Sequence, residues 1–119
     1  MENRAFTLVM MPPQSDIRRG WAETVARADV GVRVLQPETI EEAMRDIVDA
    51  DAAFGAIPPE VLAKATRLRW LQAPQIAPPA GFYYKELIEH PVVVTNQREI
   101  FNDHIGAHIM AFVLAFARG

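Results

Sequence analysis

The chain has 119 residues, half of them apolar, a formal net charge of −3 and no cysteine. This length fits one packed domain, and the lack of cysteine excludes a disulfide framework, a thiolate nucleophile and a cysteine-based zinc site. Charges are interspersed rather than clustered as on a nucleic-acid-binding surface, and without a bilayer-length apolar run or a signal-peptide core we expect a cytoplasmic protein with no membrane partner.

The first predicted strand runs from Phe6 to Met10 and is apolar on both faces, which is typical of the centre of a parallel sheet. Ser15 or Asp16 then caps a helix, because either side chain can accept a hydrogen bond from an amide of the first turn. The apolar face of this helix is expected to carry Trp21, Val25 and Ala28. A second short strand is predicted from Val30 to Leu35.

The next helix begins with a capping-box sequence. Thr39 and Glu42 have the spacing at which the threonine oxygen accepts from the third amide and the glutamate reaches back. One side of this helix is expected to carry Ile40, Met44, Ile47 and Val48. A third strand is predicted from Ala50 to Gly55, and Pro58 and Pro59 open a short helix that reaches Ala65, since proline is tolerated in a first turn.

The second half of the chain continues the same alternation. Strands are predicted from Leu68 to Gln72 and from Val92 to Thr95, with a loop or helix between them, and an apolar helix is predicted over residues 103–118. Strands that alternate with helices predict a parallel sheet covered on both faces. The residues therefore indicate an α/β sandwich with five strands, and they leave the strand order open.

Two motifs carry a family resemblance. Leu68-Arg69-Trp70-Leu71-Gln72 precedes a proline-rich loop, and Val92-Val93-Val94-Thr95-Asn96 leads through a polar turn into the last helix, which ends Ala117-Arg118-Gly119. This order resembles the first domain of the D-isomer-specific 2-hydroxyacid dehydrogenase family. The resemblance implies a flavodoxin-like three-layer sandwich with a parallel sheet of strand order 2-1-3-4-5. It also implies that residues 1–119 are the substrate-side half of an enzyme, ending before its nucleotide-binding domain.

The resemblance implies a parent oxidoreductase that uses NAD or NADP to interconvert small 2-hydroxy and 2-oxo acids. In the family, the catalytic arginine, glutamate and histidine lie beyond this segment, so we expect no catalytic residue in this chain. No G-x-G-x-x-G follows any predicted strand, so we expect these residues alone to bind no NAD or NADP. The expected partners are a small 2-oxo or 2-hydroxy acid and the nucleotide-binding domain.

The resemblance places substrate binding in the loop after the fourth strand, where two backbone amides hold the carboxylate. Counting along this sequence gives Ile76 and Ala77, which both keep an N–H, unlike the neighbouring prolines. Ala77 stands where the family has glycine, and Pro78 and Pro79 replace its Val-Asp pair, so this loop departs from the family pattern. The opposing interpretation is a stiff proline-rich connection that binds no ligand.

Polar residues at the start of the last helix are further candidates. Formate-oxidising members of the family place an asparagine near this point, so the resemblance suggests Asn102 as a substrate ligand, although asparagine also suits a helix N-cap. His104 is a candidate for the cofactor side, facing the cleft between the two domains. His104 and His108 lie one turn apart, but two histidines without a third ligand do not predict a metal site.

The last helix also predicts self-association. Its large apolar residues are Ile105, Ile109, Met110, Phe112, Val113, Leu114 and Phe116. They cover most of its circumference, and such a helix needs burial on more than one side. We therefore expect a homodimer through residues 103–118, either helix against helix or by exchange of the helix between chains. The alternative to an enzyme half is a stand-alone, non-catalytic interaction module with the same flavodoxin-like fold.

Overall fold

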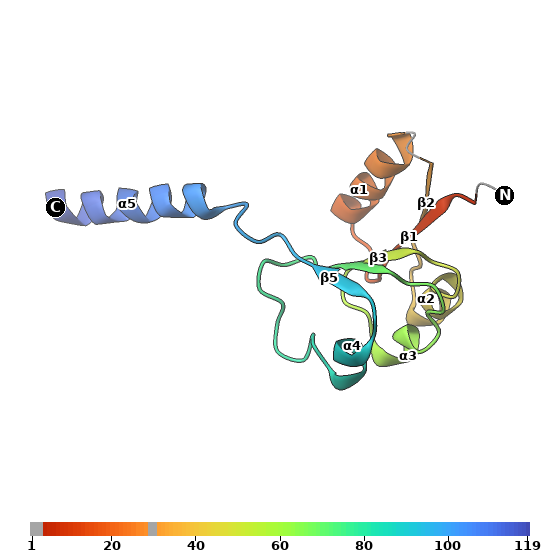
Figure 1. The fold of residues 1–119 in the computed structure, drawn as a ribbon. Coiled ribbons are helices and arrows are strands. Elements are labelled where there is room, and N and C mark those ends of the chain that lie inside the picture. The colour runs from red at the N-terminus through yellow and green to blue at the C-terminus, as the bar shows by residue number, and fades with distance from the viewer. Residues whose placement is uncertain (1–3, 29–30) are drawn as a thin grey trace.

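The computed structural model describes residues 4–28 and 31–119 and contains one five-stranded parallel sheet (Figure 1). Its strands are β1 (Phe6–Met10), β2 (Val32–Leu35), β3 (Ala52–Phe54), β4 (Trp70–Gln72) and β5 (Val93–Thr95). Its helices are α1 (Asp16–Arg27), α2 (Ile40–Asp46), α3 (Pro59–Leu62), α4 (Lys85–Glu89) and α5 (Asn102–Arg118). The sheet order β2-β1-β3-β4-β5 confirms the predicted α/β, flavodoxin-like fold.

The main core lies between the sheet and three helices. Helices α2, α3 and α4 cover one face, and α1 lies on the other (Figure 1). Side chains alternate between the two faces of a strand, so Val9, Ala53 and Leu71 point towards α2, α3 and α4, where they are almost fully buried. Ile47 and Val61 complete this core from the helix side. One face of the sheet is therefore well packed.

The opposite face is covered over only part of its width. Leu8, Ala52, Trp70 and Val93 form one row across β1, β3, β4 and β5. Ala52 is fully buried, whereas Trp70 is 43% exposed and Val93 is 61% exposed. Helix α1 lies on the β2 side of the sheet, so its cover ends before it reaches β4 and β5.

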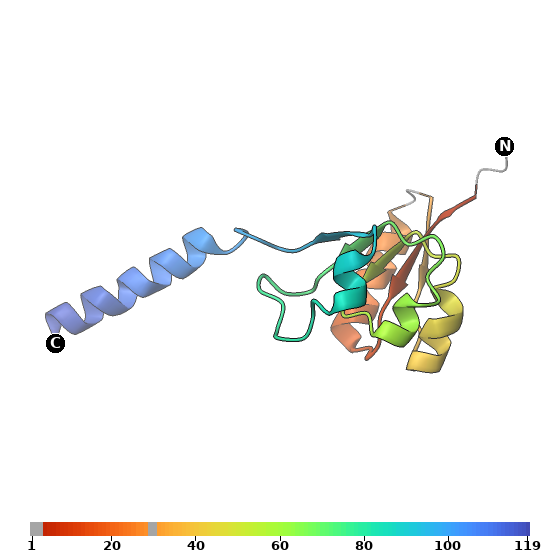
Figure 2. The same ribbon diagram turned by 60° about the horizontal axis from the view of Figure 1, so that its bottom comes forward.

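Helix α5 projects away from the sheet (Figures 1 and 2), and residues 101–119 are all exposed. The protein measures 65 Å along its longest axis and 36 and 27 Å along the others. The helix begins at Asn102, one residue earlier than predicted, and Phe101 takes the N-cap position without a side-chain hydrogen bond. Asn102 is therefore not the N-cap. Within the described residues, no helix is long and apolar enough to cross a membrane.

The two earlier helix caps lie where the sequence predicts them. Ser15, one of the two expected caps, is the N-cap of α1, and its hydroxyl accepts from an amide of the first turn at 3.2 Å. Thr39 caps α2 and accepts from the Glu42 amide at 3.2 Å. The Glu42 carboxylate reaches back to the amide of Glu38, at 2.7 Å, rather than to that of Thr39. Both helix starts are thus fixed by local side-chain hydrogen bonds.

Several boundaries and faces differ from the prediction. β2 begins at Val32, and Val30 lies outside the described residues. α3 ends at Leu62 rather than Ala65, because the amides of Lys64 and Ala65 bond to carbonyls three residues back, as in a 3₁₀ turn. In α1 the buried residue is Ala22, whereas the predicted Trp21 is 49% exposed and lies at the edge of the helix–sheet contact.

Two glycine-to-alanine substitutions test whether the turn after β3 requires a glycine. Gly55 follows β3 with φ of 119°, and an added Cβ would lie 3.0 Å from the Cβ of buried Met11. Gly55→Ala is expected to lower the free energy of unfolding by about 1–3 kcal/mol, because alanine is strained at this φ. Urea unfolding of the variant measures this difference.

Gly20 is the control, because it lies in α1 and an added Cβ would meet nothing within 4 Å. Gly20→Ala is expected to stabilise the protein by about 0.5–1 kcal/mol, since alanine is the better helix former. Equal effects of the two substitutions would contradict the strained turn after β3.

Candidate functional site

The carboxyl ends of β1, β3, β4 and β5 meet at one edge of the sheet. Backbone hydrogen bonds extend the ladder one residue past the strands, from Met11 to Phe54 (2.9 Å), from Gly55 to Gln72 (3.0 Å) and from Ala73 to Thr95 (2.8 Å). The loops that follow these strands therefore start side by side. Ligands of open parallel sheets bind at this edge.

Asn96 joins the loop after β4 to the end of β5. Its Nδ2 donates to the Ile76 carbonyl at 2.9 Å, and its Oδ1 accepts from the Arg98 amide at 3.1 Å. The peptide between Ile76 and Ala77 is trans, so its C=O and N–H point in opposite directions. Since the carbonyl faces Asn96, the Ala77 amide points away from it.

The two amides predicted to bind substrate lie on the surface of this loop. Ile76 is 40% exposed and Ala77 is also exposed. Within residues 4–28 and 31–119, neither amide donates a hydrogen bond. Adjacent N–H groups that have no acceptor in the protein are donors that an anion such as a carboxylate can use. The loop therefore offers hydrogen-bond donors at the edge where a ligand is expected.

A polar network locks β4 to β5 beside Asn96. The Trp70 indole N–H donates to the Thr95 hydroxyl at 2.7 Å, and that hydroxyl donates to the Gln72 side chain, also at 2.7 Å. Gln72 in turn donates to the Ala73 carbonyl at 3.0 Å. The side chains of both strands are thus fixed where the binding loop begins.

Tyr84 fixes the loop after β3. Its hydroxyl donates to the Ile57 carbonyl at 2.7 Å. Burial raises the pKa of Tyr84 to about 12, and the nearby charges of Glu86 and Glu60 act in the same direction. The hydroxyl therefore keeps its proton, and with it the hydrogen bond to the loop, at any physiological pH.

Arg18 brings a positive charge to the same edge of the sheet. Its guanidinium donates to the carbonyls of Met11 (3.0 Å) and Pro13 (2.9 Å) and lies 5.9 Å from the centre of the Phe54 ring. Neither Arg18 nor Asn96 was among the candidates from sequence. The available signals were an arginine in the first turn of the first helix and an asparagine at the end of the V-T-N motif.

Asn102 and His104 lie apart from the binding loop, on the projecting helix α5 (Figure 2). His104 and His108 line a shallow apolar hollow along the helix itself, and the His108 ring packs edge-on against Phe112 with centroids 4.8 Å apart. Among the described residues there is no group of three or more metal-ligating side chains. The helix candidates and the loop candidates thus do not share one cleft.

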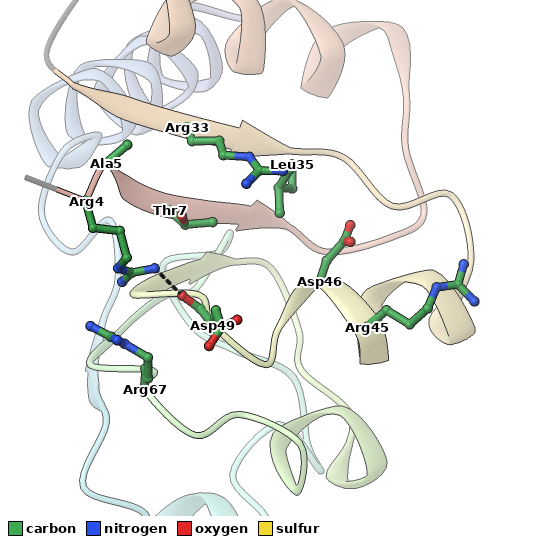
Figure 3. Close-up of a pocket in the computed structure, with 9 residues that line it drawn as sticks. All are labelled: Arg4, Ala5, Thr7, Arg33, Leu35, Arg45, Asp46, Asp49 and Arg67. Carbon is green, nitrogen blue, oxygen red and sulfur yellow. Dashed lines mark hydrogen bonds between the residues drawn. The ribbon is translucent and has the colours of Figure 1, made fainter. Parts of the chain in front are cut away.

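Two other hollows lie in the described part of the protein, and the first of them reaches this edge at Met10, Phe54, Gln72 and Gln97. An apolar cavity of about 310 Å³ lies between α1 and the uncovered part of the sheet. A cavity of about 530 Å³ at the amino ends of the strands is lined by residues that include Arg4, Arg33, Arg45, Arg67, Asp46 and Asp49 (Figure 3). These arginines are far apart in sequence, which is why the sequence did not reveal the second cavity.

Part of the arginine-lined cavity has a structural role. Arg4 donates to the Asp49 carbonyl at 2.8 Å and pairs with the buried Asp51 carboxylate at 2.5 Å (Figure 3 shows the bond to Asp49). Asp51 also accepts from the Thr7 amide at 3.0 Å. Arg4 therefore ties the start of β1 to the start of β3, and its charge is already compensated.

No protein-family model and no curated protein matches the chain. The resemblance to the D-2-hydroxyacid dehydrogenases therefore depends on the motifs of this sequence alone.

The raised pKa of Tyr84 predicts a loss of stability in alkali. An unfolded tyrosine ionises near pH 10, whereas the folded Tyr84 holds its proton to about pH 12. The contribution of the Tyr84 proton to the free energy of unfolding is fully present below about pH 10. It is lost as the pH rises towards 12, because the tyrosine of the unfolded state loses its proton first. Tyr84→Phe is expected to reduce the fall in the free energy of unfolding across this range.

The measurement is urea unfolding at several pH values between about 9 and 12. Tyr83→Phe is the control, since Tyr83 is the exposed neighbour and its replacement is expected to leave the alkaline fall unchanged. An identical fall in wild type and Tyr84→Phe would contradict the role assigned to burial.

Proposed function

We propose that this chain is the substrate-binding half of an NAD(P)-dependent oxidoreductase that acts on small 2-hydroxy or 2-oxo acids, similar to the D-2-hydroxyacid dehydrogenases. The observation that supports this is that the adjacent, exposed residues Ile76 and Ala77 have amides that donate no hydrogen bond within the described residues, and that Asn96 holds the peptide between them. They lie at the carboxyl edge of a parallel sheet of order 2-1-3-4-5, where ligands of such sheets bind.

The chemistry of this loop suits a carboxylate. An anionic oxygen strengthens each hydrogen bond that it accepts, and such bonds contribute about 1.5–3 kcal/mol each. Because Asn96 fixes the direction of the Ala77 N–H, little ordering is left to the ligand. In this proposal the loop holds the acid, while hydride transfer and the nucleotide belong to the second domain of the parent enzyme.

Ala77 does not prevent this role, although the resembled family has glycine there. Among the described residues other than glycine, only Glu99 has a positive φ. Ala77 therefore keeps a backbone conformation that alanine adopts without strain. The exposed amides need no glycine at this position.

The proposal predicts weak, local binding of small 2-oxo acids. Titration of glyoxylate or pyruvate into the ¹⁵N-labelled chain is expected to shift the amide resonances of Ile76 and Ala77, with a dissociation constant in the millimolar range, since 1 mM corresponds to about 4.1 kcal/mol. Asn96→Ala is expected to weaken this binding by about threefold to tenfold, because it frees the peptide that carries the Ala77 amide.

Gln75→Ala is the matched control, because Gln75 is exposed in the same loop and carries the same kind of amide side chain. It is expected to leave the affinity unchanged, and pyruvamide, which lacks the charge, is expected not to shift the loop. Shifts confined to Arg33 and Arg67 at the other edge of the sheet would overturn the assignment, as would no shift at all.

A second prediction concerns the nucleotide. Residues 1–119 contain no G-x-G-x-x-G after a strand, so calorimetric titration with NADH is expected to give no saturable heat. Incubation with glyoxylate and NADH is likewise expected to give no oxidation of NADH. Saturable binding in the micromolar range would contradict the division of roles proposed here.

The alternative of a non-catalytic interaction module has one specific observation in its favour. The large apolar side chains of α5 are all more than half exposed, from 52% at Val113 to 86% at Phe116. Apolar surfaces of this kind mark sites of protein association. Failure of the acid titration together with stable self-association would favour the module.

A further inference from the structure

Two apolar surfaces of the described chain face solvent. One is the cavity between α1 and the sheet, here called the sheet groove, whose lining includes Met10, Trp21, Phe54, Trp70 and Gln97. The other is the α5 stripe, formed by Ile105, Ile109, Phe112 and Phe116. We propose that two copies of the chain exchange α5, so that the stripe of each copy lies in the sheet groove of the other.

On the face that carries α1, no described helix packs against β4 and β5. Along one row, exposure rises from zero at Ala52 to 43% at Trp70 and 61% at Val93. Parallel sheets are normally covered on both faces, and helices α2, α3 and α4 already complete the other face (Figure 1). The uncovered area over β4 and β5 lies next to α1, where one further helix can pack.

Helix α5 fits this area in length and in charge. Its 17 residues span about 25 Å at 1.5 Å per residue, which is longer than any strand of the sheet. From Ile105 to Ala117 it contains no aspartate, glutamate, lysine or arginine. The residues that line the groove are uncharged too, so packing the helix there buries no unpaired charge.

The buried area is sufficient for a stable dimer. The aromatic side chains at Trp21, Trp70, Phe112 and Phe116 are 43–86% exposed. Covering them in both copies removes roughly 800 Å² from water, at about 150–250 Å² per full aromatic side chain. The isoleucines of the stripe and Val93 bring the total to the roughly 1,200 Å² at which stable interfaces begin.

The sheet groove is better filled by α5 of a second copy than by α5 of the same chain. The segment after Asn96 leads away from β5, and α5 lies beyond the sheet rather than over it (Figures 1 and 2). An arm extended from its own sheet can be exchanged with an identical arm, and the reciprocal exchange closes a twofold dimer. This exchange covers both apolar surfaces of each copy at once.

Single cysteines test the exchange cleanly, because the chain has none of its own. Chains with Val93→Cys, in the uncovered row, are mixed with chains carrying Phe112→Cys, on the stripe, and treated with a short thiol-reactive cross-linker. A covalent pair containing one chain of each kind is expected. Lys64→Cys mixed with Phe112→Cys is the control, since Lys64 follows α3 on the opposite face, and it is expected to give several-fold less product.

Charge substitutions give an independent readout by sedimentation. The wild-type chain is expected to sediment as a dimer at micromolar concentration. Phe112→Asp is expected to raise the dimer dissociation constant by about tenfold or more, because a buried aromatic side chain is lost from the stripe. Ala111→Asp, one residue away and off the stripe, introduces the same charge and is expected to change it by no more than about twofold.

Four results would overturn the exchange. A monomer at all concentrations shows that the chain does not bind a second copy of itself. A chain that carries both Val93→Cys and Phe112→Cys is compared with the mixture of single-cysteine chains. Cross-linking in the double variant alone shows that α5 folds back onto its own sheet. Cross-links between two Phe112 positions without any to Val93 show helix-on-helix association. Equal weakening by Phe112→Asp and Ala111→Asp, with helicity retained in circular dichroism, shows that the stripe is not the contact.

Discussion

A parallel sheet needs cover on both of its faces, and this requirement governs most of the structure. Helices α2, α3 and α4 meet it on one face with a closed core around Val9, Ile47 and Leu71. On the other face α1 is the only helix among the residues that the structure describes, and side chains along one row become steadily more exposed from β3 to β5. The same chain carries an apolar helix without a packing partner among the described residues. The two features are therefore best understood together, as one packing layer that is incomplete within a single copy.

The hydrogen bonds that hold the candidate binding site are already made within a single copy. The loop after β4 is held by Asn96 from the end of β5, and the loop after β3 is held by Tyr84. Both anchors come from elements on, or at the edge of, the well-packed side of the sheet. The peptide that carries the Ala77 amide is thus held by a hydrogen bond that a single copy already makes. This separates the two proposals physically, since acid binding can be present in a monomer and the dimer can form without acid.

The sequence was most informative where the physics is local. The apolar run of β1 and the cap at Thr39 were readable because each depends on neighbouring residues. The strand order followed from the family resemblance, not from periodicity. The contact between Asn96 and Ile76 joins residues 20 positions apart, and no local pattern signals such a pair. The direction of α5 was equally hidden, because an apolar helix specifies that it needs burial but not which surface provides it.

One chain of contacts joins the sheet groove to the binding loop. Trp70 lines the groove, and its indole N–H donates to Thr95, which precedes Asn96 in the chain. In the proposed dimer, a helix packed against the Trp70 ring would restrict the rotation of the ring and so favour this hydrogen bond to the end of β5. Asn96, the next residue, would then donate to the Ile76 carbonyl from a backbone that moves less. The geometry supplies the contiguous path, and the free energy that it can carry is bounded by the single hydrogen bond between Trp70 and Thr95, about 0.5–1.5 kcal/mol.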